Sequence, residues 1–162
     1  METGLSRFSE PANKLVHWFN RNSKSGSRKN IAAHYDLGNE FFHLWLDESL
    51  MYSSAVFDDP KMSLEEASLA KMRRVCEKLE LTDSDELLEI GTGWGGLAIY
   101  AAKEYGCRVT TTTISEKQYE FSVRRVKEAG LEDQVTVLKK DYRDLTGQFD
   151  KLVSIEMLEA IG

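Results

Sequence analysis

The sequence contains 162 residues, of which 41% are hydrophobic and 30% are charged, a composition typical of one globular domain. Its formal net charge of -6 argues against a general nucleic-acid binder, because contact with phosphate backbones needs a basic surface. No apolar run approaches the roughly 20 residues that cross a bilayer, and residues 1–10 carry no secretory signal pattern, so we expect a cytoplasmic protein.

Two short helices are predicted in the first part of the chain. Residues 12–20 carry apolar side chains at helical spacing, and residues 39–46 (NEFFHLWL) are dense in aromatic side chains. Between them, residues 21–30 are basic and rich in Ser and Gly, without an acid. We interpret this stretch as a solvated linker, with contact to anionic lipid headgroups as the alternative. Residues 1–62 are therefore expected to form a helical cover with a basic linker.

Residues 63–162 alternate predicted helices and strands. Ser63 and Glu66 form a capping box that starts a long helix toward Leu81. The later predicted elements are strands over 86–90, 107–113, 134–138 and 149–155, with helices over 94–105 and 115–129.

This alternation indicates right-handed βαβ units and a parallel sheet, hence an α/β, Rossmann-like fold. A complete sheet of this kind usually has about six or seven strands. We therefore expect an incomplete core, truncated after its fourth strand, with that strand near one edge of the sheet.

A glycine-rich segment, residues 89–96 (EIGTGWGG), follows the first predicted strand and opens the next helix. Gly91, Gly93 and Gly95 let the chain turn tightly and let a ligand lie against bare peptide groups. A P-loop is excluded, because no Gly-Lys-Ser/Thr follows. The dinucleotide fingerprint needs Gly96 as its last glycine, and the second strand ends VTTTTIS without an acid, which weakens an NAD interpretation. A tight turn without a ligand is the remaining alternative.

The two cysteines, Cys76 and Cys107, lack the neighbours of a metal-binding motif. We expect both to be reduced thiols that pack as small apolar side chains, and we predict no metal site.

Four segments together resemble the cyclopropane fatty acid synthase and mycolic acid cyclopropane synthase family. In chain order they are HYDLGNEFFHLWLDESLMYSSAVF, LEIGTGWGGLAIYAA, VTTTTISEKQ and KKDYRDLTGQFDKLVSIEMLEAIG, so the resemblance runs from about His34 to Gly162. It implies a class I S-adenosylmethionine methyltransferase fold. It also implies transfer of a methyl or methylene group to the double bond of an unsaturated phospholipid acyl chain, which gives a cyclopropane ring.

The resemblance assigns cofactor contacts to residues in each segment. Tyr52 and Ser53 would contact S-adenosylmethionine from the cover, and the glycine segment would line its methionine and ribose part. Thr113 and Gln118 would replace the missing acid, because neutral groups can form the same hydrogen bonds. The predicted set is Tyr52, Ser53, Gly91, Thr92, Gly93, Gly95, Thr113, Gln118, Asp141, Tyr142 and Arg143. For Arg143 and Asp144, an exposed salt-bridged turn is the alternative.

Glu159 and Ser54 are the predicted catalytic residues. By the resemblance, Glu159 would hold a bicarbonate ion that acts as base, although Ala160 stands where His is commonest in the family. Ser54 stands where many members carry Cys, but its hydroxyl and N–H can still bind an anion. Glu156 is interpreted as a cap or a surface charge.

The implied partner is an unsaturated phospholipid, reached by peripheral contact with the membrane, and a homodimer is left open. Three alternatives remain: a methyl-branched lipid product, methylation of a small amine, or an inactive cofactor-binding fragment.

Overall fold

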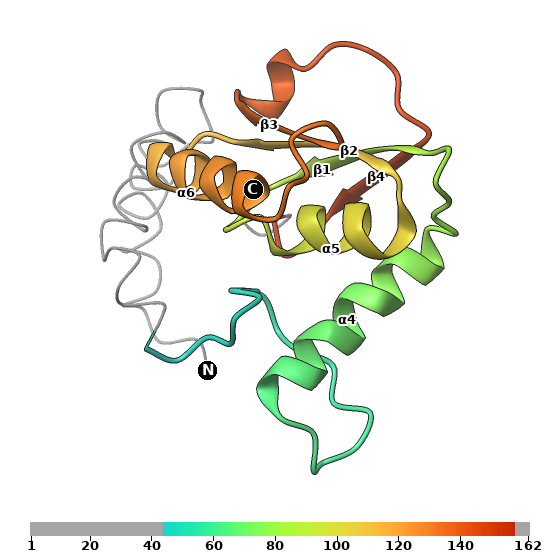
Figure 1. Ribbon diagram of the computed structural model, residues 1–162, viewed down its shortest axis with the longest axis vertical. Coiled ribbons are helices and arrows are strands. Elements are labelled where there is room, and N and C mark those ends of the chain that lie inside the picture. The colour runs from blue at the N-terminus through green and yellow to red at the C-terminus, as the bar shows by residue number, and fades with distance from the viewer. Residues whose placement is uncertain (1–43, 158–162) are drawn as a thin grey trace, which may run out of the picture.

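The computed structural model describes residues 44–157, which form a parallel sheet with helices packed against it (Figure 1). The elements are α4 (Leu64–Lys78), β1 (Glu86–Ile90), α5 (Gly96–Tyr105), β2 (Arg108–Thr113), α6 (Glu116–Glu128), β3 (Val135–Lys139), η1 (Tyr142–Asp144) and β4 (Lys151–Ser154). The four strands pair in parallel in the order β3-β2-β1-β4. The predicted α/β fold is confirmed, and β4 lies at an edge as expected.

The strand order explains where the helices lie. The connections β1-α5-β2 and β2-α6-β3 step across the sheet in the same direction, and right-handed crossovers then put α5 and α6 on the same face. The chain next returns past β1 to β4 through residues 140–150, which contain only the short η1. The first half of a doubly wound sheet is therefore covered by helices on one side (Figure 1).

The core fills the space between this helical layer and the sheet. Its fully buried side chains include Met72 and Cys76 from α4, Leu87 from β1 and Val109 from β2. Burial raises the pKa of the Cys76 thiol to about 12. Cys76 and Cys107 are both free and buried, which confirms that they pack as small apolar side chains.

Local signals fixed the start of α4. The Ser63 hydroxyl accepts a hydrogen bond from the Glu66 N–H at 3.2 Å, and the Glu66 carboxylate accepts one from the Ser63 N–H at 2.7 Å. The predicted capping box is thus confirmed. The helix ends at Lys78, earlier than Leu81, because the chain turns at Glu80, whose φ is 53°.

Other boundaries differ by one or two residues. Helix α5 begins at Gly96 instead of residue 94, because Gly95 has a φ of 83° and its N–H closes a turn onto the Thr92 carbonyl at 2.9 Å. Of the helix predicted over 39–46, only residues 44–46 are described, and they form a turn and a bend. The helix predicted over 12–20 and the predicted base Glu159 lie outside the described residues.

We call residues 44–62 the cover segment. It contains turns and bends and, within these residues, no helix or strand. The domain boundary at 62/63 stays a prediction. No helix in the described part of the chain combines the length and apolar character that crossing a membrane requires.

Candidate functional site

The predicted cofactor residues gather at one edge of the sheet. The glycine loop, residues 91–95, follows the carboxyl end of β1, and Thr113 ends the neighbouring β2. Residues 155–157 leave the carboxyl end of β4 on the other side of β1. In open parallel sheets, this edge is where ligands bind, because loops on either side of a central strand part there.

The glycine loop is fixed at its base and open at its tip. The N–H groups of Gly91 and Thr92 donate to the Thr112 carbonyl at 3.0 and 3.1 Å. Gly93, with a φ of 54°, has no atom within 4 Å of the place where a Cβ would stand. A ligand can therefore lie directly against the peptide groups at Gly93, which is the geometry that a glycine-loop nucleoside site needs.

The last glycine of the motif serves a different purpose. A Cβ on Gly96 would lie 2.6 Å from the main-chain oxygen of Ser49. Gly96 is thus needed so that the cover segment can pass against the start of α5. The sequence pattern indicates this glycine only as part of a nucleotide motif, so the close contact with Ser49 is not visible in it.

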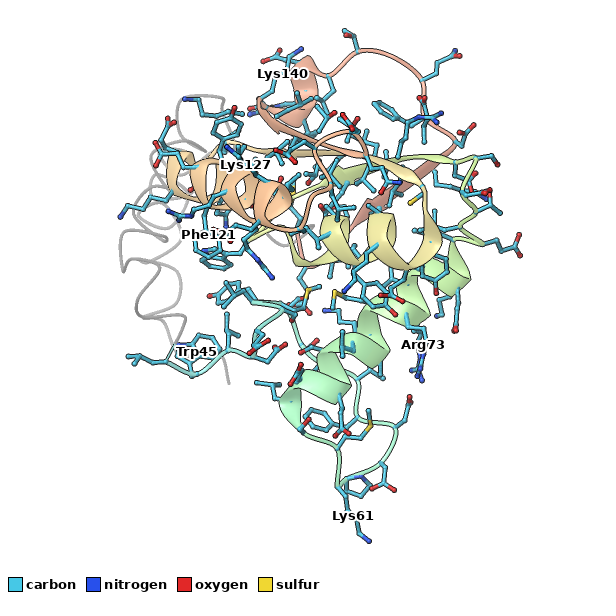
Figure 2. All side chains as sticks on the ribbon, in the orientation of Figure 1. Trp45, Lys61, Arg73, Phe121, Lys127 and Lys140 are labelled. Atoms are coloured by element: carbon cyan, nitrogen blue, oxygen red, sulfur yellow. The ribbon has the colours of Figure 1, made fainter. Side chains whose placement is uncertain are left out.

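Aromatic rings join the cover segment to the loop. The Tyr52 ring meets the Trp94 ring edge to face, with centroids 5.8 Å apart, and lies 6.1 Å from the Trp45 ring. Trp94 is buried with Leu50, and Phe121 of α6 packs against this pair. Figure 2 shows Phe121 on the side of α6 that faces the cover segment, where Trp45 is labelled. Tyr52 is therefore held beside the glycine loop and stays 42% exposed, and its contact with a cofactor stays a prediction.

A buried acid lies beneath the loop. Glu89 on β1 accepts a hydrogen bond from the Thr111 hydroxyl at 2.6 Å, and the Thr111 hydroxyl lies 2.7 Å from that of Thr92. Burial raises the pKa of Glu89 to about 8, and the hydrogen bond from Thr111 offsets this only in part. Thr92 as a whole is 3% exposed, so it supports the loop from within.

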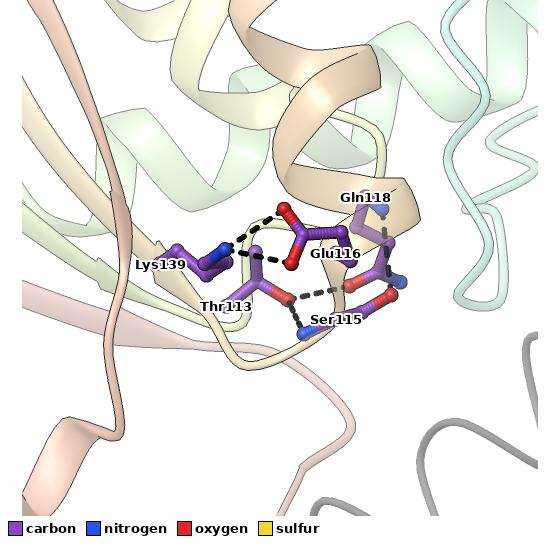
Figure 3. A network of polar contacts seen from close by, with 5 residues as sticks. All are labelled: Thr113, Ser115, Glu116, Gln118 and Lys139. Atoms are coloured by element: carbon purple, nitrogen blue, oxygen red, sulfur yellow. Dashed lines mark hydrogen bonds and ion pairs between the residues drawn. The ribbon is translucent and has the colours of Figure 1, made fainter.

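Thr113 and Gln118 are brought together at the end of β2 (Figure 3). The Thr113 hydroxyl donates to Gln118 Oε1 at 2.8 Å and accepts from the Ser115 N–H at 3.1 Å. At the border of this network, Lys139 on β3 forms an ion pair with Glu116 at 2.6 Å. The two charges cancel, so the pair adds no net charge there. The tip of β2 thus presents neutral hydrogen-bonding groups, both of them buried.

The DYRDL segment forms η1 after β3. Asp141, which is 3% exposed, accepts hydrogen bonds from the Arg143 N–H at 3.0 Å and from its guanidinium at 2.6 and 2.8 Å. The ion pair is therefore internal to the segment, between Arg143 and Asp141. It positions Tyr142 beyond the carboxyl edge of β3, next to the Thr113 region.

Ser53 and Ser54 face an ion pair that the sequence did not reveal. Glu156 Oε1 accepts hydrogen bonds from the Ser54 N–H at 2.9 Å and the Ser54 hydroxyl at 2.8 Å. Lys71 Nζ lies 3.6 Å from the same oxygen and donates to the Ser53 hydroxyl. Partial burial opposes ionisation of Glu156, but the bonds from Ser54 and the charge of Lys71 outweigh it and lower its pKa.

The pKa of Lys71 is lowered by burial, against the opposing charge of Glu156. Residues 54 and 156 are 102 positions apart, so no local pattern pointed to this contact. The available signal was the presence of an acid directly after β4 together with a Lys on the buried side of α4, since a buried cation needs an acidic partner.

A hollow lies at the opposite edge of the sheet. It measures about 580 Å³ and is lined by Glu86, Arg108, Gln148, Phe149 and Asp150. This is the amino edge of the strands, where Arg108 and Glu86 form an ion pair at 3.0 Å. The glycine loop and the predicted residues lie at the other edge, so we place the site there. Within residues 44–157, no group of three or more His, Cys, Asp or Glu side chains could hold a metal ion.

Comparison with known proteins agrees with this geometry. The family described as mycolic acid cyclopropane synthetase matches residues 22–162. A probable fatty acid methyltransferase of Pseudomonas putida is 46% identical over 134 residues, which cover 82% of this chain and 34% of that protein. The cyclopropane-fatty-acyl-phospholipid synthase of Escherichia coli K12 is 44% identical over 144 residues, covering 89% of this chain and 36% of that protein.

Among solved structures, mycolic acid cyclopropane synthase CmaA1 complexed with SAH and CTAB aligns with a TM-score of 0.78 and 33% identity. The alignment covers 82% of this chain and 46% of that chain. The chain thus spans about a third of the length of the two curated relatives, at 34% and 36%.

Proposed function

Because the chain belongs to the mycolic acid cyclopropane synthetase family, we propose that the protein uses S-adenosylmethionine to convert a double bond of an unsaturated phospholipid acyl chain into a cyclopropane ring. The observation that carries this proposal is the open peptide surface at Gly93, set between the aromatic cover segment and the neutral tip of β2. The relatives indicate the type of reaction, and the glycine loop offers a binding site for the methyl donor.

The residues at the loop fit the methyl donor better than a dinucleotide. Dinucleotide sites usually carry an acid at the end of the second strand for the ribose. Here that position holds Thr113, which is hydrogen-bonded to Gln118. The aligned CmaA1 structure holds SAH, the demethylated form of the donor, which supports the same choice. When bound, S-adenosylmethionine would supply an electrophilic methyl group on a positively charged sulfur.

The chain's own residues would hold and shield the reactants. Gly93 and its neighbours would contact the methionine and ribose part, and Thr113, Gln118 and Tyr142 would border the nucleoside. Tyr52 would close the site from the cover segment, since its ring already packs on Trp94. An aromatic face can also stabilise the positive charge that an alkene gains on methylation, provided that water is kept away.

The acceptor is proposed to be a lipid, met at the surface of the membrane from the cytoplasmic side. Four large hydrophobic side chains of the cover segment stay exposed: Leu44, Trp45, Tyr52 and Phe57. Exposed aromatic and aliphatic side chains near a lipid-modifying site suit peripheral contact with acyl chains. The homodimer stays a prediction. Bicarbonate also stays a prediction, because Glu159 lies outside the described residues.

A methyl-branched lipid is the second candidate. The Pseudomonas putida relative is named as a probable fatty acid methyltransferase, so the family match alone leaves the fate of the methylated chain open. The two products differ in one step. Loss of a proton from the transferred methyl group closes a ring, whereas another fate of the cation leaves a branch.

The test incubates the complete protein with vesicles of dioleoyl phosphatidylethanolamine and isotopically labelled S-adenosylmethionine. We expect label in the acyl chains, a gain of one methylene unit by mass spectrometry, and the chromatographic retention of a cyclopropane standard. Retention of a methyl-branched standard would favour the second candidate. Labelling of small amines with none in lipid would overturn both.

A further inference from the structure

The carboxylate of Glu156 lies in a small anion cradle. The cradle is formed by Ser54 of the cover segment and Lys71 of α4. The Ser54 N–H, the Ser54 hydroxyl and the Lys71 ammonium all approach one carboxylate oxygen, at 2.9, 2.8 and 3.6 Å. Three donors around one oxygen are the arrangement that binds an anion. The other carboxylate oxygen of Glu156, Oε2, takes part in none of these three contacts.

The cradle is built to hold this carboxylate. The Lys71 side chain is only 10% exposed, so its charge sits within the protein and needs a partner. Glu156 has a φ of 49°, a left-handed conformation that residues other than glycine rarely adopt. Such backbone persists where surrounding contacts hold it, and it is concentrated at functional sites.

The cradle also borders the glycine loop. Met157, the next residue, places its Sδ 3.4 Å from the position that a Cβ on Gly91 would take. On the other side, Ser54 lies two residues after Tyr52, whose ring packs on Trp94 of the loop. The carboxylate therefore stands between the loop, the cover segment and α4, at the edge of the sheet where the reaction is proposed.

We propose that Glu156 fills the anion cradle as the chain's own base and accepts the proton whose loss closes the cyclopropane ring. This role rests on the proposed function. The resemblance to the family placed a bound bicarbonate beside Ser54, but both Ser54 donors are already used by Glu156. No Ser54 donor is therefore left for a small anion, so in this proposal the base is a side chain and not the bicarbonate of the resemblance.

The π electron pair of the alkene forms a bond to the methyl carbon, and the sulfur keeps the pair of the broken S–CH₃ bond. The acyl chain is left with a carbocation next to the new methyl group. A C–H bond of that methyl breaks, its electron pair closes the three-membered ring, and the proton passes to Glu156. Because a carbocation is a very strong acid, an ionised carboxylate of low pKa is basic enough.

The test compares the wild-type protein with Glu156→Gln and Glu156→Gly, using complete protein and the same vesicles. Glu86→Gln is the matched control, because Glu86 is also paired with a cation and its side chain is similarly exposed, 48% against 46%, at the opposite edge of the sheet. Melting temperature and calorimetric affinity for S-adenosylhomocysteine report on folding and the donor site. Binding of ¹³C-labelled bicarbonate, followed by NMR, reports on the cradle itself.

We expect the cyclopropane yield to fall at least 100-fold in Glu156→Gln, with affinity for S-adenosylhomocysteine changed less than about threefold and Glu86→Gln unaffected. Wild-type activity should not respond to removal of bicarbonate from the buffer. In Glu156→Gly, the vacated donors should bind labelled bicarbonate, and added bicarbonate or formate should restore ring closure in part.

The inference would be overturned by a wild-type enzyme that needs bicarbonate, or by full ring formation in Glu156→Gln. It would equally be overturned if labelled bicarbonate bound the wild type as well as Glu156→Gly. A wild-type protein that forms no cyclopropane at all would instead refute the proposed function, and the bicarbonate spectra would still decide whether Glu156 fills the cradle.

Discussion

The guanidinium of Arg125 on α6 donates a hydrogen bond to the main-chain oxygen of Trp94 at 2.9 Å, which ties α6 to the glycine loop. The same side chain donates to the carbonyls of Ser49 at 3.0 Å and Glu48 at 3.0 Å. Its pKa is lowered by burial, against the opposing charges of Asp47 and Glu128. One side chain thus connects three parts of the site: helix α6, the loop and the cover segment.

Replacing Arg125 with Met should therefore loosen the cover segment. Three carbonyl oxygens lose their donor, so we expect the free energy of unfolding to fall by roughly 1–3 kcal/mol. Affinity for S-adenosylhomocysteine should weaken by about tenfold, equivalent to roughly 1.4 kcal/mol. Arg124→Met is the control on the same helix, because the contact of Arg124 is with the face of the Phe121 ring, 5.2 Å from its centroid. Equal effects of the two variants would contradict this account.

Two glycines provide a test of the open loop. Gly93 and Gly130 both have positive φ, 54° and 68°, and neither has an atom within 4 Å of an added Cβ. Substitution by Ala should cost each about 1–2 kcal/mol of stability through backbone strain. Only Gly93→Ala should weaken binding of S-adenosylhomocysteine in calorimetry, because only Gly93 faces the proposed ligand. Unchanged affinity in Gly93→Ala would exclude a ligand at this peptide.

The buried acid Glu89 should make stability depend on pH. Its pKa is about 8 in the folded state against an ordinary value of 4.5, so between these values the folded chain holds a proton that the unfolded chain has lost. The stabilisation is complete below the unfolded value and is lost as the pH rises toward 8. The free energy of unfolding should fall by up to about 1.4 kcal/mol per pH unit in that window.

Glu89→Gln should flatten this slope, because an amide cannot ionise and can still accept the hydrogen bond from Thr111. Urea denaturation at pH 5 to 8 measures the difference, with Glu86→Gln as the exposed control on the same strand. Parallel curves for wild type and Glu89→Gln would show that Glu89 is ionised in the folded protein.

Features set by neighbouring residues were predictable from the sequence. The capping box at Ser63 and the strand-turn-helix around the glycines depend on side chains a few positions apart, so their pattern is visible in the chain. The start of α5 was placed two residues early, because the apolar spacing continues through Trp94 while the backbone at Gly95 cannot be helical.

Features set by tertiary packing were not predictable. Glu156 reaches Ser54 across 102 positions, and Arg125 reaches Ser49 across 76. Glu89 stands in the glycine motif, and nothing in that motif marks it as buried; it is 5% exposed because β1 is a central strand, paired with β2 and β4. An acid in such a strand is a candidate for a shifted pKa, which was the available signal.

The most direct test of the central claim, that the glycine loop holds a sulfonium nucleoside, is calorimetric titration of the folded protein with S-adenosylhomocysteine and, separately, with NAD. We predict saturable binding of S-adenosylhomocysteine that is weaker in Gly93→Ala, and no measurable heat with NAD. Ready binding of NAD without uptake of S-adenosylhomocysteine would contradict it.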